Sequence, residues 1–306
     1  MSQIWRGIGG GIEVLENVNE MADLPDISTV DSEGVWYIES GEFGPDYIAP
    51  TNWDSSAGEF TNWFSLFDGQ ILADVPDSVI HHYNPSNFTE SIWPDEEGDS
   101  DMDTINGLSF NSSAFDSDDD GGVAGDGEDD YGQTDTMGDF GSNMTSNFAI
   151  VVGFEALTES QGRLLGIRNN IDDTRLQLQT QSTANSGNDT IKLLLMDSGG
   201  DLIAGEGPEV TDGEAYLAII NKTGNSANDI EIYLNDVENN VANSIRDEDF
   251  SNPSDFDIPM TYFAESDEGT IHNHTDPTFS HIFWFDDSLN LDERENVADV
   301  YGWYSD

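Results

Sequence analysis

Short apolar runs, each about the length of a β-strand, recur through the second half of this 306-residue sequence. Gly, Asn, Asp and Ser separate them at intervals of roughly 10–18 residues, and no helical periodicity fills the gaps. Strands joined by tight turns pair antiparallel, whereas parallel strands need a longer crossover. The spacing therefore predicts an all-β fold, an antiparallel β-sandwich. Its predicted strands are Phe148–Ala156, Arg163–Ile167, Arg175–Thr180 (with Leu176 and Leu178 on one face), Ile191–Met196, Ala215–Asn221, Ile230–Leu234, Met260–Ala264 and Phe279–Phe285.

The period changes near the end of the chain. Asn290 precedes Glu293 by three residues, which is the spacing of a capping box at a helix N-terminus. Apolar residues then follow at helical intervals. We expect a short C-terminal helix that packs onto the sandwich. The residues on its apolar side are Leu291, Val297, Val300, Tyr301 and Tyr304.

Residues 1–68 form a separate compositional unit. Gly34–Glu39 and Asn62–Phe67 are aromatic, β-branched runs, and a turn pair, Asp68-Gly69, closes the second. We predict a small β-rich domain that depends on assembly with copies of itself or on docking. Residues 70–147 are less regular, with short strand candidates at Ile80–Tyr83 and Leu108–Phe110. From Asp95 to Asp139 there is no base, and we interpret this region as solvated acidic loops.

The net charge of the sequence indicates the salt concentration in which the protein is stable. Sixty-three Asp and Glu stand against eight Lys and Arg, so the net charge is −55, and no base lies between Arg6 and Arg163. Such a chain repels itself in dilute buffer, whereas in molar salt the Debye length falls to about 3 Å. The composition predicts a protein of near-saturated brine. It also argues against nucleic acid as a partner, since there is no basic patch to bind phosphates.

Other composition features exclude several classes. Sixteen Phe, nine Tyr and seven Trp argue against disorder, and the absence of Cys excludes disulfides and thiolate metal sites. The opening residues show no signal peptide, and no stretch is long and apolar enough to span a bilayer. We therefore expect synthesis in the cytoplasm without export by the usual signals, and no membrane insertion.

Three stretches resemble the concanavalin A-like, laminin G-type jelly roll. Ala215–Val237 is similar to the hairpin of that family, with Asn235-Asp236 at the turn where Asp/Asn-Gly is usual. Phe279–Tyr301 is similar to its closing strand and helix. Tyr83–Phe110, which contains Trp93-Pro94-Asp95, is similar to its opening strands. The resemblance covers about residues 72–304 and implies a lectin-like jelly-roll domain over residues 72–306, with residues 95–139 as its acidic loop region.

Residues 19–68 are similar to a small module common in tailed-phage fibres. The similarity is carried by Asp23-Leu24-Pro25, by Asp31–Ile38 and by Trp63-Phe64-Ser65-Leu66. A fibre-like unit before a lectin-like jelly roll, without an export signal, implies a virion protein. Combined with the brine composition, it implies a haloarchaeal tailed virus.

Aromatic side chains on a lectin-like surface can stack on the faces of sugars without using charge. Most Trp in a sandwich belong to the core, so exposure decides which of them serve. The candidates for carbohydrate contact are Trp93, Tyr131, Trp284 and Trp303.

Asp116, Asp118 and Asp120 have the alternate spacing of the first half of a calcium loop. The acid expected at the twelfth position is missing, because Gly127 stands there and Glu128 comes one step later. In so acidic a sequence this pattern also arises by chance. Two readings stay open, a calcium site and a solvated acidic loop.

The remaining polar motifs favour structural readings. The histidines, at positions 81, 82, 272, 274 and 281, are interpreted as surface side chains, although His272 and His274 alternate and could share a metal. Asp229 and Glu231 have the alternate spacing of a glycosidase carboxylate pair, but we interpret them as the outward polar alternation of an amphipathic strand. Asn-x-Ser/Thr sequons begin at Asn87, Asn111, Asn143, Asn188, Asn221 and Asn273.

We therefore expect a structural, non-enzymatic virion protein: a capsid turret, spike or tail fibre of a halophilic archaeal virus. Residues 1–68 would bind other capsid or tail proteins and sister subunits, in a trimer or a pentamer. The jelly roll would contact host surface glycans or S-layer glycoprotein on the extracellular particle. No cofactor is required, and bound calcium or other cations suit the carboxylates. The alternative is a secreted haloarchaeal polysaccharide-degrading enzyme of the same fold; a cellular adhesin module is a third option.

Overall fold

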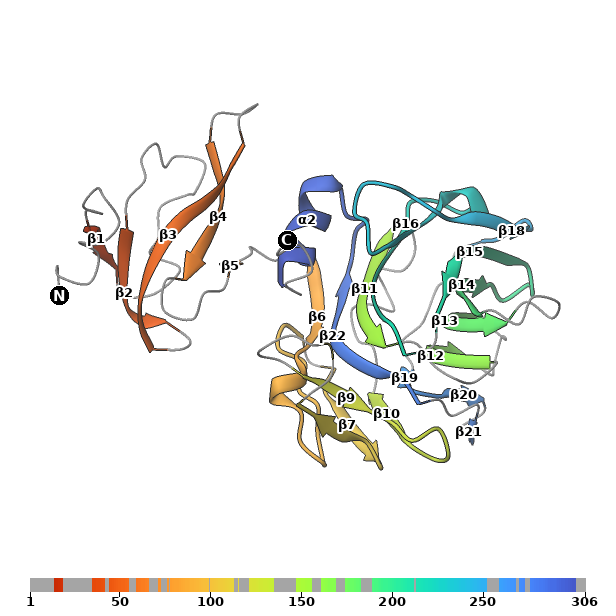
Figure 1. Ribbon diagram of the computed structural model, residues 1–306. Helices are drawn as coiled ribbons and strands as arrows, with labels where there is room; N and C mark the ends of the chain where they lie inside the picture. Colours follow the sequence, from red (N-terminus) through yellow and green to blue (C-terminus); the bar gives the residue numbers. More distant parts are fainter. Residues whose placement is uncertain are drawn as a thin grey trace. The chain divides into compact units, whose positions relative to one another are not determined.

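A computed structural model gives the structure of the chain (Figure 1). Backbone contacts divide the chain into two units, Met1–Val75 with Gly302–Asp306, and Pro76–Tyr301. Each unit is described by itself. The structure describes residues 14–18, 35–41, 44–54, 59–65, 71–72, 76, 78–98, 100–112, 115, 121–134, 147–155, 161–168, 174–182, 189–211, 213–251, 259–267, 270–272 and 276–300.

The first unit contains a five-stranded sheet in the order β1-β2-β3-β4-β5, in which β1 and β2 are parallel and the other neighbours antiparallel. The predicted strands near residues 34–39 and 62–67 correspond to β2 and β4. The long strand β3 was not predicted, because Pro45 and Pro50 lack the N–H that a sheet ladder uses. The strands are β1 (Val14–Val18), β2 (Val35–Gly41), β3 (Gly44–Asp54), β4 (Glu59–Ser65) and β5 (Ile71–Leu72).

The second unit is an antiparallel β-sandwich, as predicted (Figure 1). One sheet has eight strands in the order β18-β15-β14-β13-β12-β19-β10-β7. The other has seven, in the order β17-β16-β11-β22-β9-β8 with β6 also paired to β22. Each of the eight predicted strands falls on an observed one: β11 (Phe148–Glu155), β12 (Gln161–Arg168), β13 (Arg175–Ser182), β14 (Asp189–Met196), β16 (Ala215–Lys222), β17 (Ile230–Leu234), β19 (Thr261–Tyr262) and β22 (Thr278–Phe285).

The core lies between the two sheets. Ile150 and Val152 of β11 are fully buried, as are Leu176 and Leu178 of β13, whose shared face was predicted. The central strand β22 is buried on both faces along its whole length. Its side chains therefore alternate between the core and the outer face of the seven-stranded sheet.

The acidic region after Asp95 corrects the prediction of solvated loops. Its described residues form short strands that extend both sheets, and Asp95 and Asp130 are buried. Acidic side chains hide the strand signal, since they are depleted in strands generally. The strands of this first part of the sandwich are β6 (Val79–Tyr83), β7 (Met102–Asn106), β8 (Ser109–Asn111), β9 (Gly122–Ala124) and β10 (Tyr131–Thr134).

Four further strands were missed. The longest, β15 (Leu202–Val210), carries Gly205, where an added Cβ would lie 2.6 Å from Ile230 Cγ2. In the sequence Gly205 resembles a break in the strand pattern. In the structure it is the residue whose missing side chain lets the two sheets approach. The others are β18 (Asn243–Asp247), β20 (Glu265–Asp267) and β21 (Thr270–His272), the last two forming a small separate hairpin.

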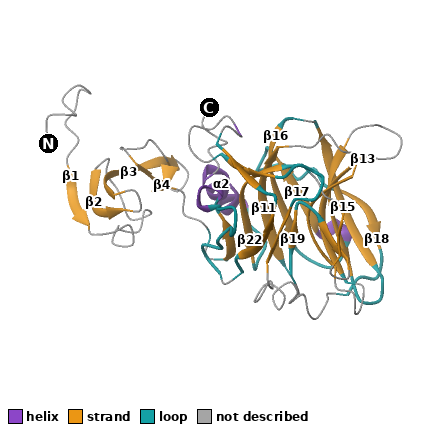
Figure 2. Ribbon diagram, turned by 90° about the horizontal axis from the view of Figure 1, so that it is seen from below, coloured by secondary structure: helices purple, strands orange, loops and turns teal. Residues whose placement is uncertain are grey.

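The C-terminal helix α2 (Leu291–Val300) confirms the predicted capping box (Figure 2). The Asn290 N–H donates to Glu293 Oε2 at 2.7 Å, and the Glu293 N–H donates to Asn290 Oδ1 at 3.2 Å. Val297 is buried as expected, but Leu291 is 39% exposed. Val300, Tyr301 and Tyr304 of the predicted apolar side lie outside the residues whose side chains are described.

Arg294 fixes this helix to the outer face of the seven-stranded sheet. Its Nε donates to the Val237 carbonyl at 2.8 Å, and its Nη1 donates to the Leu289 carbonyl at 2.7 Å. The guanidinium lies 4.0 Å from the centre of the Tyr233 ring, a cation–π contact. One buried arginine thus binds the helix, the preceding loop and β17 together.

Candidate functional site

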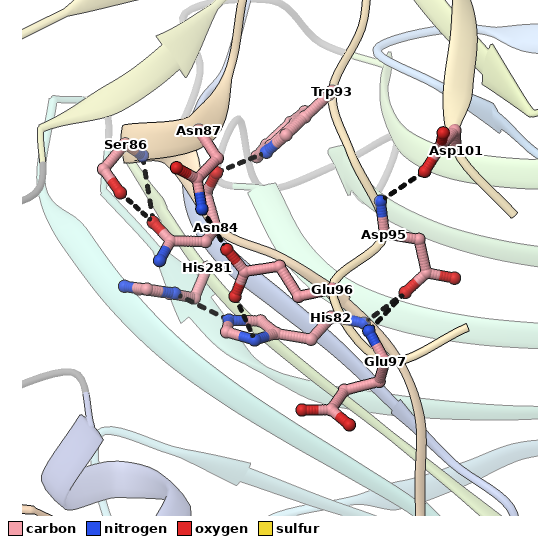
Figure 3. Close-up of polar contacts among 10 residues, drawn as sticks. All are labelled: His82, Asn84, Ser86, Asn87, Trp93, Asp95, Glu96, Glu97, Asp101 and His281. Carbon is pink, nitrogen blue, oxygen red and sulfur yellow. Dashed lines mark hydrogen bonds and ion pairs between the residues drawn. The ribbon is translucent and has the colours of Figure 1, made fainter. Parts of the chain in front are cut away.

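Three histidines and two carboxylates meet on β6, β22 and the loop after Trp93; Figure 3 shows four of them, His82, His281, Asp95 and Glu96. His81, His82 and His281 are 3%, 9% and 5% exposed, so the interpretation of these histidines as surface side chains was wrong. Their partners are Asp95 and Glu96. We name these five residues the histidine cluster.

Strand pairing sets the geometry of the cluster. His82 stands opposite Phe283 in the β6–β22 register, and its ring stacks on the Phe283 ring with 4.0 Å between centroids. The Glu96 N–H donates to the His82 carbonyl at 2.8 Å, which lays the loop along β6. Adjacent residues of the strand therefore face adjacent residues of the loop, and two histidine–carboxylate pairs form, one toward each face of β6.

The first pair joins His81 Nδ1 to Asp95 Oδ2 at 2.6 Å. The Asp95 carboxylate also accepts the N–H groups of His82 and Ser100, at 3.0 and 3.2 Å. Burial alone would raise the pKa of Asp95, but the hydrogen bond and charge of His81 and the amide donors outweigh it. The pKa of Asp95 therefore lies below its ordinary value.

The second pair continues into a chain of three groups. Glu96 Oε2 lies 3.0 Å from His82 Nδ1, and His82 Nε2 lies 2.9 Å from His281 Nδ1. Asn87 donates its side-chain N–H to the other oxygen of Glu96. Burial would raise the pKa of Glu96, yet the hydrogen bonds and charges of these groups lower it. A carboxylate and two imidazoles in a row can hold a proton and pass it along the chain.

A second polar group lies at one edge of the sandwich, where the 107–108 and 125–130 connections join the two sheets. Ligand oxygens of Asp126, Asp129 and Asp130 lie within 4.8 Å of one another, the first two residues exposed and the third buried. The Asp126 N–H donates to Asp130 Oδ2 at 2.9 Å. A Cβ on Gly107, whose φ is +75°, would overlap Asp130 Oδ1, so glycine is needed there. Carboxylate oxygens at this spacing suit a calcium-type ion.

The predicted calcium residues Asp116, Asp118 and Asp120 lie outside the described residues, as do the side chain of His272 and the whole of His274. The carboxylates that the structure brings together are later in the same acidic segment. No sequence pattern indicates them, because their meeting depends on the β7–β8 connection that Gly107 allows.

The predicted aromatic contacts separate into three outcomes. Trp93 and Trp284 are fully buried in the core, so the prediction that they stack on sugars is wrong. Their indole N–H groups donate to the Asn84 carbonyl at 2.7 Å and to Tyr262 Oη at 3.1 Å. Tyr131 is half-buried, and Trp303 lies outside the described residues. Phe110, 45% exposed on β8, was not among the candidates.

The Asp229 and Glu231 carboxylates do not form a pair on one strand. Asp229 lies before β17, where its Oδ2 accepts the Ser226 N–H at 2.9 Å in a capping box. Glu231 accepts the Tyr233 hydroxyl at 3.0 Å. The sequon residue Asn221 is 1% exposed, and both atoms of its amide group bond to the backbone of Leu289, so it is unavailable for glycosylation.

No helix within the described residues is long and apolar enough to cross a membrane. No protein-family model matches the sequence, and no curated protein matches it.

Solved structures do match the fold. The binding domain of Paraclostridial Mosquitocidal Protein 1 superposes with a TM-score of 0.53 at 12% identity, over 74% of this chain and 53% of that one. The binding domain of Botulinum Neurotoxin DC, in complex with SialylT, gives 0.51 at 11%, over 76% and 53%. Trypanosoma rangeli sialidase gives 0.51 at 9%, over 88% and 45%. This chain spans about half the length of each. At such identities the likeness shows the fold alone: the chain contains a β-sandwich like those of these proteins.

Proposed function

We propose that the sandwich binds glycans. The observation that carries this proposal is the fold, which resembles a toxin binding domain solved with SialylT. The surface chemistry supports it, because a protein of net charge −55 gains little from charge–charge contacts with an anionic cell envelope. Stacking and hydrogen bonding to neutral sugar hydroxyls avoid that repulsion.

The proposed contact residues are Tyr131 and Phe110. They belong to β10 and β8, on either side of the connections that hold the aspartate group. We assign the Tyr131 ring, at the start of β10, and the exposed carboxylates of Asp126 and Asp129 to the same ligand. Carboxylates accept hydrogen bonds from sugar hydroxyls, and aromatic rings stack on the apolar sugar face.

Glycan binding can be tested in molar KCl with sialyl-oligosaccharides and with glycans released from haloarchaeal surface glycoproteins. Tyr131→Ala and Phe110→Ala should each weaken binding about 3- to 10-fold, the size of one aromatic contact. Ile245→Ala is the matched control, because Ile245 is 48% exposed on β18, at the opposite edge of the eight-stranded sheet from β10 and β7. Undiminished binding by both aromatic variants would remove this surface from the proposal. If the unmodified protein binds neither of the two glycan probes, the proposed function is refuted.

We further propose that the chain is a virion structural protein of a halophilic archaeal virus: a turret, spike or tail fibre. The support is the acidic composition together with a separate β-sheet unit before the sandwich. Mass spectrometry of purified haloarchaeal virions, and the genes that flank the coding sequence, test this proposal independently of glycan binding. Finding the chain in cell supernatants but never in virions would contradict it.

The first unit is proposed to join copies of the chain, as a trimer or a pentamer, and to bind other capsid or tail proteins. Because Arg6 is the single base in the sequence of that unit, its contacts form between like-charged surfaces. Lowering the salt concentration should therefore dissociate the assembly before the sandwich unfolds. Light scattering and circular dichroism along one KCl dilution series measure both events, and the reverse order would contradict the proposal.

We propose no catalytic activity for the sandwich. Glu231 is engaged by Tyr233 and Asn221, and Asp229 caps a turn, so neither resembles a free catalytic carboxylate. Incubation of the protein with the same glycans in molar KCl should leave their mass spectra unchanged. Product formation that disappears in Glu231→Gln would favour the alternative, a polysaccharide-degrading enzyme.

A further inference from the structure

The contact between His82 and His281 limits how many protons the two imidazoles can carry. Their facing nitrogens, Nε2 and Nδ1, lie 2.9 Å apart. In a hydrogen bond at that distance, one of the two nitrogens carries the proton and the other accepts it with a lone pair. The remaining nitrogen of His82 faces Glu96 Oε2 at 3.0 Å, as a donor to the carboxylate.

Glu96, His82 and His281 have two protonation states in which both the Glu96–His82 and the His82–His281 hydrogen bonds are kept. With both imidazoles neutral, His82 donates from Nδ1 to Glu96 and accepts at Nε2 from His281. One added proton is accommodated, on His281 Nε2 or, after a shift along the chain, on His82. A second added proton would place an N–H on each facing nitrogen and two positive charges in contact.

We propose that the histidine cluster is an acid-sensitive latch, in which a second proton on the His82–His281 pair separates the two rings and releases residues 79–101 from β22. The latch is independent of the proposed glycan binding. Strand β6 pairs with β22, and the loop after Trp93 is bound to β6 through Asp95 and Glu96. The strand and the loop would therefore move together when the two rings separate.

The titratable groups around the pair, among the described residues, are His81, Asp95 and Glu96, with Asp101 bonded to the Asp95 N–H and Tyr83 nearby. The pKa values of Asp95 and Glu96 are lowered, so both carboxylates stay charged at pH 5. The pKa of Tyr83 is raised by burial, so its hydroxyl stays neutral. Protonation between about pH 5 and 7 therefore falls on the imidazoles.

The direction of the effect follows from the proton count. Once the segment is released from β22, both imidazoles take a proton below an ordinary imidazole pKa of about 6.5, whereas the latched pair takes one. The released state binds one more proton, so acid favours release. The opening constant should rise by about tenfold for each pH unit below about 6.5.

Hydrogen exchange of the full-length protein in molar KCl measures this opening. Exchange of peptides from residues 79–101, corrected for intrinsic rates, should accelerate about tenfold per unit between pH 6.5 and 5. Peptides from residues 189–210 serve as the control within the molecule, because Lys192 and Glu206 pair there at 3.0 Å without an imidazole. Their corrected exchange should stay level.

His281→Gln is the decisive variant, since its amide takes no proton but can turn its oxygen to accept from a protonated His82 Nε2, so the latched and released states bind the same number of protons. The acceleration should disappear in this variant and in His281→Phe, which continues the stacked rings of Phe283 and Phe285. An unchanged pH dependence in a folded variant would overturn the latch. If neither variant folds, the unmodified protein still tests the latch. Exchange in residues 79–101 that does not change with pH, or an equal acceleration in residues 189–210, would overturn the proposal.

Discussion

Residues 76–134 and residues 189–300 of one sandwich balance buried charge in different ways. The first part has no Lys or Arg, and its carboxylates Asp95, which is buried, and Glu96 meet His81 and His82. The second part uses permanent cations: Lys192 pairs with Glu206, and Arg294 binds backbone carbonyls. Charge pairing in the first part therefore depends on pH, while pairing in the second does not.

The comparison also shows where a strongly acidic protein keeps its few bases. Lys192, Lys222 and Arg294 are buried, whereas Arg246 is exposed and pairs with Glu248 at 2.9 Å. A surface base would gain little in brine, because salt screens exposed pairs. A buried base satisfies carbonyls or carboxylates that would otherwise be costly. Among the bases whose side chains the structure describes, Lys192, Lys222 and Arg294 are thus buried, where their interactions contribute most to stability.

The largest expected effect is the loss of Arg294. Arg294→Ala removes two hydrogen bonds to the carbonyls of Val237 and Leu289 and the stacking on Tyr233. It should lower the free energy of unfolding by about 3–4 kcal/mol, measured by urea titration in molar KCl. Arg246→Ala is the control, with a change within about 0.5 kcal/mol. Equal effects of the two variants would show that burial does not distinguish the bases.

Removing the charge of Asp95 tests the other part. Asp95→Asn should cost about 2–3 kcal/mol near pH 7, because a buried charge-assisted bond to His81 is lost. The pKa of folded Asp95 lies below its ordinary value, so this stabilisation is complete above about pH 4 and disappears as pH falls through the lowered pKa. Urea titrations from pH 7 to 3 should show the two proteins converging; a constant difference would contradict this origin.

Lys222 is the exception among the permanent cations. Burial lowers its pKa to about 8 from an ordinary 10.5, only partly offset by Asp229. The unfolded chain binds more protons between these values, so the stability of the native protein should rise from pH 8 to 10.5. Lys222→Met removes this rise and should stabilise the protein by about 1–2 kcal/mol at pH 7. A destabilised variant without any change in pH dependence would show that the ammonium is well compensated.

The smallest effect concerns an interaction that needs no base. Asn290→Ala breaks the capping box with Glu293 and should cost about 1 kcal/mol by thermal unfolding in molar KCl. Leu291→Ala, at the exposed first residue of α2, is the control and should change the melting temperature little. A loss as large as that of Arg294→Ala would mean that the cap, and not the arginine, holds the helix.

The predicted strands of the second half were confirmed because apolar alternation and turn residues act locally. The C-terminal cap and the hairpin turn at Asn235, whose φ is +53°, were readable for the same reason. Strands β3 and β15 escaped prediction, since their proline and glycine residues resemble breaks until the neighbouring strands are known.

The histidine cluster was not predictable from the residues alone. His82 and His281 stand 199 positions apart, and their contact exists because β6 pairs with β22 in one register. A shift of one residue would turn His82 into the core and Tyr83 out of it. One available signal was the position of His281 within the apolar run Phe279–Phe285, which marks a buried strand and thus a buried imidazole.

The sequence by itself determined an acidic, all-β protein with a two-sheet sandwich and a capped terminal helix, because composition and local periodicity need no knowledge of distant contacts. Only the tertiary structure decided which tryptophans lie in the core, which carboxylates meet, and which cations are buried. These outcomes depend on strand order and register across the whole chain. Each follows from long-range pairing, which no local pattern encodes.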